Sequence, residues 1–175
     1  WDADSMHRVS RFMSKAFEDR AKYLGDPDFY PVPVERLTSK EYAQECIREM
    51  EGGRAPAEAR TPAHERPAGL VLGHTTNLCA VDRWGNAVAI NQTVNLTYGS
   101  KITLPGTGVI LNNEMDDFSA QPGVPNAFGL IGSKANSIAP GKRPLSSMAP
   151  TIVVRDGRPV LILGGAGGPV IITAL

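Results

Sequence analysis

A proline-rich segment between Gly52 and Gly69 separates two parts of the sequence that differ in character. It contains three prolines among alanines and alternating charges, so it offers almost nothing to bury. Helical patterns precede this segment, and strand and turn patterns follow it. We therefore predict an α+β fold whose two parts are joined by a linker at residues 52–69.

The first predicted helix covers residues 5–24. Apolar side chains recur there at three- and four-residue spacing and form one stripe opposite the charged residues. Asp4 or Ser5 is expected to cap the start of this helix. Gly25 and Pro27 are expected to end it, within a tight turn.

A second helix is predicted between this turn and the linker. Pro31 and Pro33 are expected to keep the intervening chain extended. The capping-box pattern Thr38-Ser39-Lys40-Glu41 indicates where the helix begins, and Gly52-Gly53 where it ends.

Strand patterns dominate after the linker. Residues 78–81 and 87–94 are predicted to form one hairpin, and residues 151–154 and 160–163 a second. The dipeptide Asp156-Gly157 is a strong signal for the tight turn of the second hairpin. A further strand is predicted at residues 106–112.

Size and charge exclude several classes of protein. The chain has 175 residues, enough for the core of one ordinary domain. Its 18 basic residues balance its 18 acidic residues, so we expect no nucleic-acid partner. Cys46 and Cys79 share no metal-like spacing with the histidines, so no metal site is expected, while a disulfide between them stays open.

The two ends of the sequence suggest an internal part of a longer protein. It begins at Trp1 rather than Met and stops within the apolar run 171–175. It contains neither a run long and apolar enough to span a bilayer nor a secretory leader pattern. We expect that compartment signals lie outside it.

Three carboxylates fall within four positions, at Glu114, Asp116 and Asp117. Their mutual repulsion is relieved if a cation, an ammonium group or backbone N–H donors lie among them. A solvated acidic turn is the plainer alternative.

Two loops have groups that could bind anions. The hydroxyls of Ser146 and Ser147 could bind a carboxylate, although they could equally be ordinary turn residues. The glycines of residues 164–168 follow a predicted strand and could expose consecutive N–H groups to an oxyanion. A flexible turn is an equally good interpretation. Phosphate binding is the weaker option, because no nucleotide-binding motif is present.

Thr75 stands where the linker gives way to the first predicted hairpin. A threonine at a new chain terminus can act as a nucleophile with its own α-amino group as the base, and it needs no histidine. Together with an oxyanion site and clustered carboxylates, such a threonine meets the requirements of amide-bond transfer from an amino-acid donor.

Motifs along most of the chain match one family. They are residues 21–29 (AKYLGDPDF), Thr75-Thr76 with Val81-Asp82, residues 85–89 (GNAVA), 95–99, 111–119 (LNNEMDDFS) and 140–148, and Gly167-Gly168. In these motifs the sequence resembles the gamma-glutamyltranspeptidases, N-terminal-nucleophile hydrolases whose single precursor cleaves itself into a large and a small subunit. The resemblance implies an αββα sandwich. It also implies that residues 1–74 are the C-terminal part of the large subunit and residues 75–175 the N-terminal part of the small catalytic subunit.

The resemblance implies a catalytic role for four residues. Thr75 would be the nucleophile, exposed by autoproteolysis between His74 and Thr75. It would take the γ-glutamyl group from glutathione or another γ-glutamyl donor and pass it to water or to an amino acid or peptide. Thr93 would support the nucleophile, and Gly167 and Gly168 would form the oxyanion hole. Thr93 and Gly168 are also expected to bind the donor.

Five further positions match residues that bind the donor in this family. Asn95, Glu114 and Asp117 would hold its α-amino group, which suits carboxylates facing an ammonium ion. Ser146 and Ser147 would bind its α-carboxylate. The resemblance implies no cofactor and no metal, and it implies a periplasmic or extracellular location.

Two departures from the family pattern occur near the predicted site. Asn77 replaces a common histidine, and Pro169-Val170 replaces a more polar pair. The family's large-subunit arginine would lie before Trp1, and the rest of the small subunit after Leu175. The alternatives are a glutaryl-type β-lactam acylase of the same family, a binding relative without activity, and a fragment that is catalytically incompetent.

Overall fold

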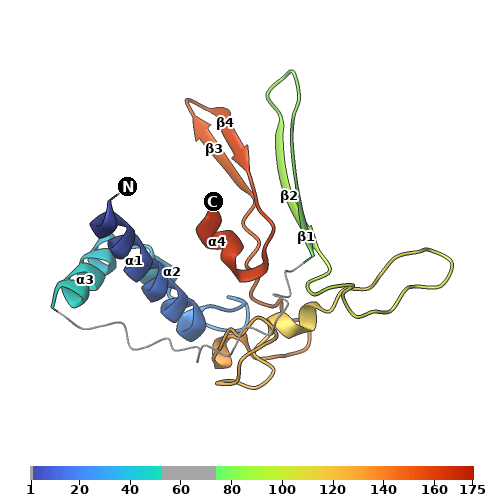
Figure 1. Ribbon diagram of the computed structural model, residues 1–175, viewed down its shortest axis with the longest axis horizontal. Coiled ribbons are helices and arrows are strands. Elements are labelled where there is room, and N and C mark those ends of the chain that lie inside the picture. The colour runs from blue at the N-terminus through green and yellow to red at the C-terminus, as the bar shows by residue number, and fades with distance from the viewer. Residues whose placement is uncertain (1, 53–73) are drawn as a thin grey trace. The chain divides into compact units, whose positions relative to one another are not determined.

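The computed structural model describes residues 2–52 and 74–175 (Figure 1). The chain divides into two compact units. The first combines residues 1–67 with residues 116–145, and the second combines residues 68–115 with residues 146–175. The predicted linker lies outside the described residues, apart from Gly52. The predicted subunit boundary at Thr75 concerns where the chain is cut, and it stays a prediction.

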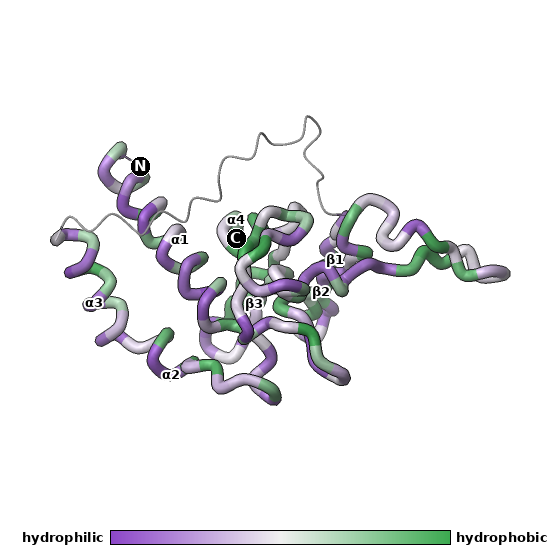
Figure 2. Tube along the Cα trace, turned by 90° about the horizontal axis from the view of Figure 1, so that it is seen from below, coloured by the Kyte–Doolittle hydropathy of each residue, from purple (hydrophilic) through white to green (hydrophobic). Residues whose placement is uncertain are grey.

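Helix α1 (Ala3–Tyr23) confirms the first predicted helix, with a different cap. Asp2 is the N-cap, and its carboxylate accepts a 2.7 Å hydrogen bond from the Ser5 backbone N–H. Asp4 and Ser5 are therefore not caps, because the helix begins at Ala3, two residues before its predicted start. Hydrophobic residues recur at intervals among the hydrophilic residues of α1 (Figure 2).

The first helix ends before Gly25, and this glycine allows a close approach between two backbone segments. A Cβ atom on Gly25 would lie 2.2 Å from the carbonyl oxygen of Ala135, which is fully buried. Glycine is therefore required because two backbone segments meet there. This contact joins the end of α1 to a segment 110 residues further along the chain.

Two more helices complete the N-terminal part of the first unit. The prediction that the chain stays extended after Pro33 is wrong, because Pro33 is the N-cap of the short helix α2 (Val34–Leu37). Proline is tolerated there, since the first residues of a helix need no backbone N–H. Helix α3 (Lys40–Glu51) is confirmed, with Ser39 as its N-cap and Gly52 at its end. A side-chain hydrogen bond connects α3 to α1, since the Tyr42 hydroxyl donates to the Asp19 carboxylate at 2.7 Å.

The second unit contains two antiparallel hairpins (Figure 1). Strand β1 (Thr75–Val81) pairs with β2 (Ala87–Thr93), and β3 (Thr151–Arg155) pairs with β4 (Arg158–Leu163). Asp156 and Gly157 have positive φ angles of 52° and 74°, which is the backbone conformation that the predicted tight turn requires. Both predicted hairpins are confirmed.

The predicted strand at residues 106–112 is wrong. Gly106 and Gly108 have φ angles of 77° and 72°, so they form a turn where a strand would need extended backbone. The segment instead folds back on residues 102–104. The Leu104 N–H donates to the Val109 carbonyl oxygen, and Ile110 forms an isolated bridge with Thr103.

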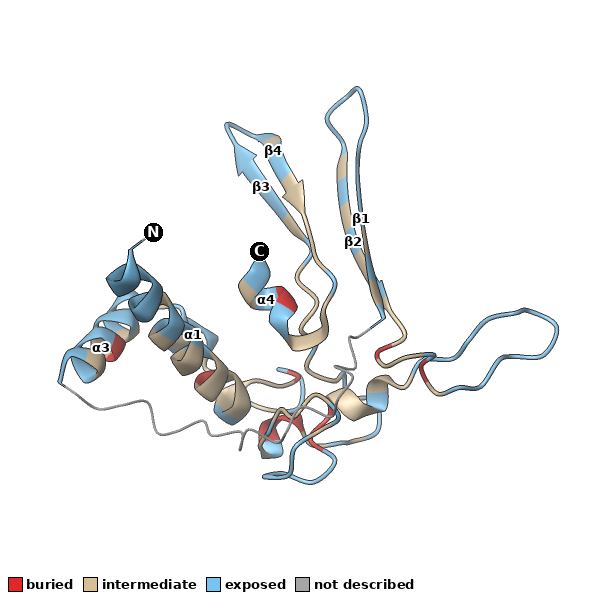
Figure 3. Cartoon of the chain, in the orientation of Figure 1, coloured by how far each residue is buried: buried red, intermediate tan, exposed pale blue. Residues whose placement is uncertain are grey.

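Many apolar side chains of the hairpins are exposed, as the pale blue of β1 to β4 indicates (Figure 3). Each hairpin is its own two-stranded sheet. The helices and sheets agree with the α+β class, whereas the αββα sandwich stays a prediction.

Candidate active site

The hydroxyls of Thr75 and Thr93 form the centre of the candidate site. The two threonines lie directly opposite each other, at the first pair of the β1–β2 ladder. Thr75 Oγ1 donates to Thr93 Oγ1 at 3.1 Å, and Thr93 Oγ1 donates to the His74 carbonyl oxygen at 3.3 Å. One hydroxyl therefore contacts both the predicted nucleophile and the carbonyl group of the bond that is predicted to break.

The backbone around Asn95 fixes the orientation of Thr93. The Asn95 N–H donates a 2.9 Å hydrogen bond to Thr93 Oγ1, and the Asn95 carbonyl accepts one from the His74 N–H at 3.1 Å. Asn95 has a φ angle of 73°, a conformation that asparagine tolerates better than most residues. Its buried side chain donates to the Asn113 carbonyl oxygen at 3.2 Å. This contact connects the threonine pair to the segment that carries Glu114.

Glu114 has a buried carboxylate oxygen, Oε1, with no hydrogen-bond partner among the described residues. Leaving a buried acceptor unpaired costs about 1–3 kcal/mol, and more for a charged group. A donor of positive charge would remove this cost. Sequence reasoning located the acidic cluster but could not detect the unpaired oxygen, because that depends on burial.

Asp117 belongs to the first unit, whereas Glu114 belongs to the second. The Asp117 carbonyl oxygen accepts a 2.7 Å hydrogen bond from the Asn136 side chain. Burial lowers the pKa of the Arg20 guanidinium, and the negative charge of Asp117 opposes that shift. Arg20 also donates to the Leu145 carbonyl oxygen at 3.4 Å. Sequence reasoning missed Arg20, which looked like one of many charges on α1.

Ser146 and Ser147 follow Leu145 directly. Ser146 is exposed, and its Oγ accepts a 3.1 Å hydrogen bond from the Met148 N–H, as in an ordinary serine turn. Ser147 is half-buried. The preceding Leu145 N–H donates to the side chain of the buried Asn136 at 3.0 Å.

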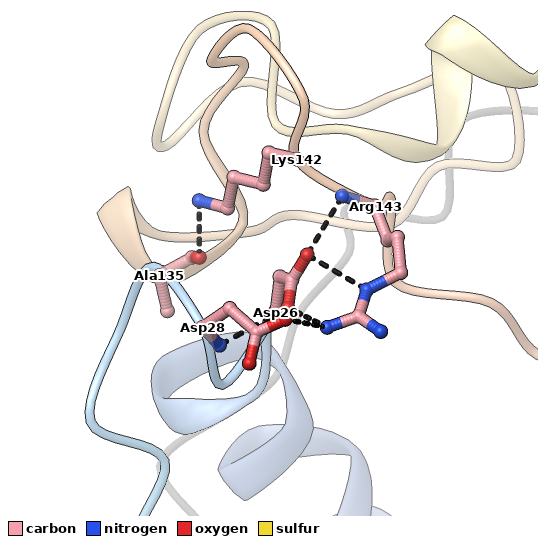
Figure 4. Close-up of polar contacts among 5 residues, drawn as sticks. All are labelled: Asp26, Asp28, Ala135, Lys142 and Arg143. Atoms are coloured by element: carbon pink, nitrogen blue, oxygen red, sulfur yellow. Dashed lines mark hydrogen bonds and ion pairs between the residues drawn. The ribbon is translucent and has the colours of Figure 1, made fainter.

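An ion pair that sequence reasoning missed holds the loop before the serines (Figure 4). The carboxylate of Asp26 accepts hydrogen bonds from the backbone N–H of Arg143 at 2.8 Å, from its Nε at 2.9 Å and from its Nη2 at 2.5 Å. Arg143 Nη2 also contacts Asp28, and Lys142 donates to the Ala135 carbonyl oxygen at 2.7 Å.

These contacts have an electrostatic consequence for Asp26. Its side chain is only 1% exposed, although that of Arg143 is 65% exposed. The hydrogen bonds from Arg143 hold the pKa of the Asp26 carboxyl well below its usual range. Asp26 and Asp28 were visible in the sequence as an acidic turn, but the burial of Asp26, which calls for a basic partner, was not.

The glycine loop follows β4. Gly167 and Gly168 have φ angles of 146° and 61°, which favour glycine. Pro169 lies in the first turn of the short 3-10 helix Gly168–Val170, where its missing N–H is not needed. The departure at Pro169 is therefore compatible with the local backbone. The short helix α4 (Ile171–Ala174) follows directly.

The predicted site residues divide between the two units. The second unit contains the threonine pair, Asn95, Glu114, both serines and both glycines, while Asp117 lies in the first unit. Hydrogen bonds link the threonine pair to Asn95, and through Asn113 to the backbone next to Glu114. The described residues contain no group of three or more His, Cys, Asp or Glu side chains that could hold a metal ion, and both cysteines are free thiols.

Comparisons with known proteins give a consistent assignment. The family model described as Gamma-glutamyltranspeptidase matches residues 1–175. The chain is 46% identical to the glutathione hydrolase proenzyme of Escherichia coli over 174 residues, which cover 99% of this chain and 30% of that protein. It is 38% identical to the Acylase ACY 1 proenzyme of a Pseudomonas species over 169 residues, 94% of this chain and 27% of that protein.

A solved structure agrees with these relatives. The gamma-glutamyltranspeptidase of Pseudomonas nitroreducens, complexed with L-DON, is 55% identical and superposes with a TM-score of 0.55 over 57% of this chain and 51% of that one. The chain spans about 30% of the length of the glutathione hydrolase proenzymes that it matches. Over its whole length, the chain belongs to the gamma-glutamyltranspeptidase family.

Proposed function

We propose that this chain carries the cleavage site and nucleophile of a self-processing γ-glutamyltransferase and glutathione hydrolase. The observation that carries the proposal is the hydroxyl of Thr93, which accepts from Thr75 and donates to the His74 carbonyl oxygen. These two contacts would align the attacking oxygen and polarise the carbonyl that it attacks. A relative's solved structure is described in terms of autoprocessing, which supports the same interpretation.

The cleavage step needs only groups near β1. Thr75 Oγ1 attacks the His74 carbonyl carbon, and the hydroxyl proton passes to the Thr75 nitrogen as the peptide C–N bond breaks. The product is an ester between the two residues. Water then hydrolyses the ester, which leaves a carboxylate on His74 and a free hydroxyl and α-amino group on Thr75. In this proposal the chain divides into large- and small-subunit parts at Thr75, and the αββα sandwich is the fold of the complete protein.

The same hydroxyl then attacks the γ-carbonyl carbon of a donor such as glutathione. The α-amino group of Thr75 takes the proton and returns it to the leaving amine, and the γ-glutamyl group stays on Thr75 as an ester. The N–H groups of Gly167 and Gly168 would stabilise the oxyanion. Water releases glutamate, whereas an amino acid or peptide receives the γ-glutamyl group. This chemistry uses no cofactor.

Donor recognition would rest on charge. The unpaired, buried Oε1 of Glu114 supports an ammonium-bearing donor, held together with Asn95 and Asp117. Ser146 and Ser147 would bind the donor's α-carboxylate through hydrogen bonds. A periplasmic or extracellular location follows from the family and stays a prediction. The described residues include no helix that is long and apolar enough to cross a membrane.

Mass spectrometry of the full-length protein tests the proposal. We expect two fragments, one of which begins at Thr75, and we expect a single uncut chain for Thr75→Ala. The matched control is Thr103→Ala, an exposed threonine in the same unit, which should still be cut. A wild-type protein that stays whole, or a Thr75→Ala variant that is cut normally, would contradict the proposal and favour a binding relative without activity.

A glutaryl-type acylase is the second candidate, supported by the similarity to the Pseudomonas acylase proenzyme. A glutaryl group lacks the α-ammonium that Glu114 is proposed to bind. Comparing the hydrolysis of a γ-glutamyl anilide and a glutaryl anilide separates the two. We expect the γ-glutamyl compound to react faster, and Glu114→Gln to reduce this preference. Equal or faster turnover of the glutaryl compound would favour the acylase.

A further inference from the structure

Two asparagines share a face of the β1–β2 hairpin with the threonine pair. Asn77 and Asn91 are partners in the ladder, two positions along from Thr75 and Thr93. Because strand side chains alternate between faces, the two pairs project on the same side, about 7 Å apart along the strands. Both asparagines are half-buried.

A chain of hydrogen bonds runs through these two amides and ends on the glycine loop. Asn77 Nδ2 donates to the Ile90 carbonyl oxygen at 3.1 Å and to Asn91 Oδ1 at 3.0 Å. Asn91 Nδ2 in turn donates to the Gly165 carbonyl oxygen at 2.6 Å. Asn91 thereby ties β2 to a residue 74 positions further along the chain. An aspartate at this position could accept from Asn77 but could not donate to Gly165.

The packing at Gly164 supports the same conclusion independently. A Cβ atom on Gly164 would lie 1.9 Å from Asn77 Nδ2 and 2.6 Å from Asn77 Cγ, far closer than any real contact. At Gly165 the nearest atoms to an added Cβ would be 3.7 Å away, which is ordinary contact. The Asn77 amide lies directly against the backbone of Gly164, so a methyl group at position 164 would displace this amide from its hydrogen bonds.

We propose that Asn77 and Asn91 are positioning residues that hold the loop of residues 164–168 against the face of the β1–β2 hairpin that carries Thr75. The inference rests on the proposed function, in which Gly167 and Gly168 of this loop supply the oxyanion donors. Neither asparagine takes part in bond making. Their role is to keep two N–H groups at a fixed place relative to the nucleophile, which is the condition for oxyanion stabilisation.

The first test uses an isosteric change. In the full-length protein, Asn91→Asp removes the donor to Gly165 and keeps the size of the side chain. We expect kcat for γ-glutamyl transfer to fall about tenfold or more, since a bond to a half-buried carbonyl oxygen is lost, while KM changes little. The matched control is Gln92→Glu, the same amide-to-acid change at the next residue, whose exposed side chain projects from the opposite face. We expect this control to keep the wild-type kcat.

The second test is a double-mutant cycle between Asn77 and Gly164. Gly164→Ala alone should lower kcat, because the new methyl group meets the Asn77 amide, whereas Gly165→Ala should be tolerated. In an Asn77→Ala background the methyl group has space, so adding Gly164→Ala should cause no further loss. If the two losses multiply instead, the contact between Asn77 and Gly164 does not hold the loop.

A readout without activity separates this inference from the proposed function. In the uncut Thr75→Ala protein, Asn91→Asp should speed amide hydrogen exchange at residues 165–168, and Gln92→Glu should leave it unchanged. Unchanged exchange and unchanged kcat in Asn91→Asp would overturn the positioning role. If Asn91→Asp speeds exchange but the wild-type protein never cleaves itself, the proposed function alone is refuted and the loop contact stays established.

Discussion

In the first unit, charged side chains join segments far apart in the sequence, whereas in the second unit neutral hydroxyl and amide groups support the backbone ladder. Asp26 and Arg143 are 117 positions apart, and they form the ion pair that holds the loop before the serines. Thr75 and Thr93 are 18 positions apart and are brought together by strand register. We therefore expect pH to act mainly on the first unit, and small changes in geometry to act mainly on the chemistry of the second.

The largest expected effect is on self-cleavage in the second unit, where neutral groups form the contacts. Thr93→Val removes the hydroxyl that contacts Thr75 and the His74 carbonyl oxygen, while it keeps the shape of the side chain. We expect self-cleavage to slow about a hundredfold or more, as when an oxyanion donor is lost, and the thermal midpoint to change little. The time course of cleavage, followed by gel electrophoresis, measures this.

The conservative variant Thr93→Ser provides the control, because it keeps the hydroxyl. Its cleavage rate should stay close to that of the wild type. Equal rates for the valine and serine variants would show that the hydroxyl is unimportant, and the contrast between the two units would disappear.

The next largest effect is expected on the stability of the first unit, which depends on charged side chains. Arg143→Ala leaves the buried Asp26 carboxylate without its main partner, so we expect the thermal midpoint to fall by several degrees. Arg143→Lys should recover only part of this loss, because lysine lacks the planar fork that bonds one carboxylate through two nitrogens. Arg158→Ala, at an exposed position of β4, is the matched control and should leave the midpoint unchanged.

A smaller effect should appear in acid. The pKa of Asp26 is lower in the folded chain than its unfolded value of 3.8. Its stabilising contribution is therefore complete above that value and is lost as the pH falls toward the folded pKa. Urea midpoints followed by the circular dichroism of the helices should fall below about pH 4, and less so in Asp26→Asn. The exposed Asp156→Asn should behave like the wild type.

The smallest effect is expected in alkali. Burial raises the pKa of Tyr42 to about 12, and the hydrogen bond to Asp19 adds to this shift while Lys15 opposes it. A raised pKa means that the neutral phenol stabilises the fold below pH 10 and that this contribution is lost between pH 10 and about 12. In Tyr42→Phe the helices should show a weaker dependence on pH in that range.

Local patterns account for the parts of the fold that the sequence predicted correctly. The apolar stripe of α1 and the dipeptide Asp156-Gly157 each act within a few residues, so their consequences are visible in the sequence. The predicted strand at residues 106–112 failed because its apolar residues looked like a strand, while Gly106 and Gly108 required a turn. In that case the glycine signal outweighed the hydropathy signal.

Long-range contacts explain what the sequence left out. Nothing near Asp26 indicates that Arg143 is its partner, and nothing near Glu114 indicates that one oxygen is buried without a donor. The position of Thr75 after the linker suggests a nucleophile, and the family resemblance adds Thr93, but the hydrogen bond between them is visible only in the structure. Patterns of residues thus located the groups, and three-dimensional contacts defined their arrangement.

The contact between Asn77 and Gly164 has a consequence for how relatives of this protein vary. Because a side chain at position 164 would displace the amide at position 77, the two positions are not free to change separately. Across the family we expect covariation, with a residue larger than glycine at position 164 only where position 77 has a smaller side chain. A lineage could then gain a side chain in this loop only after a first substitution on the opposing strand.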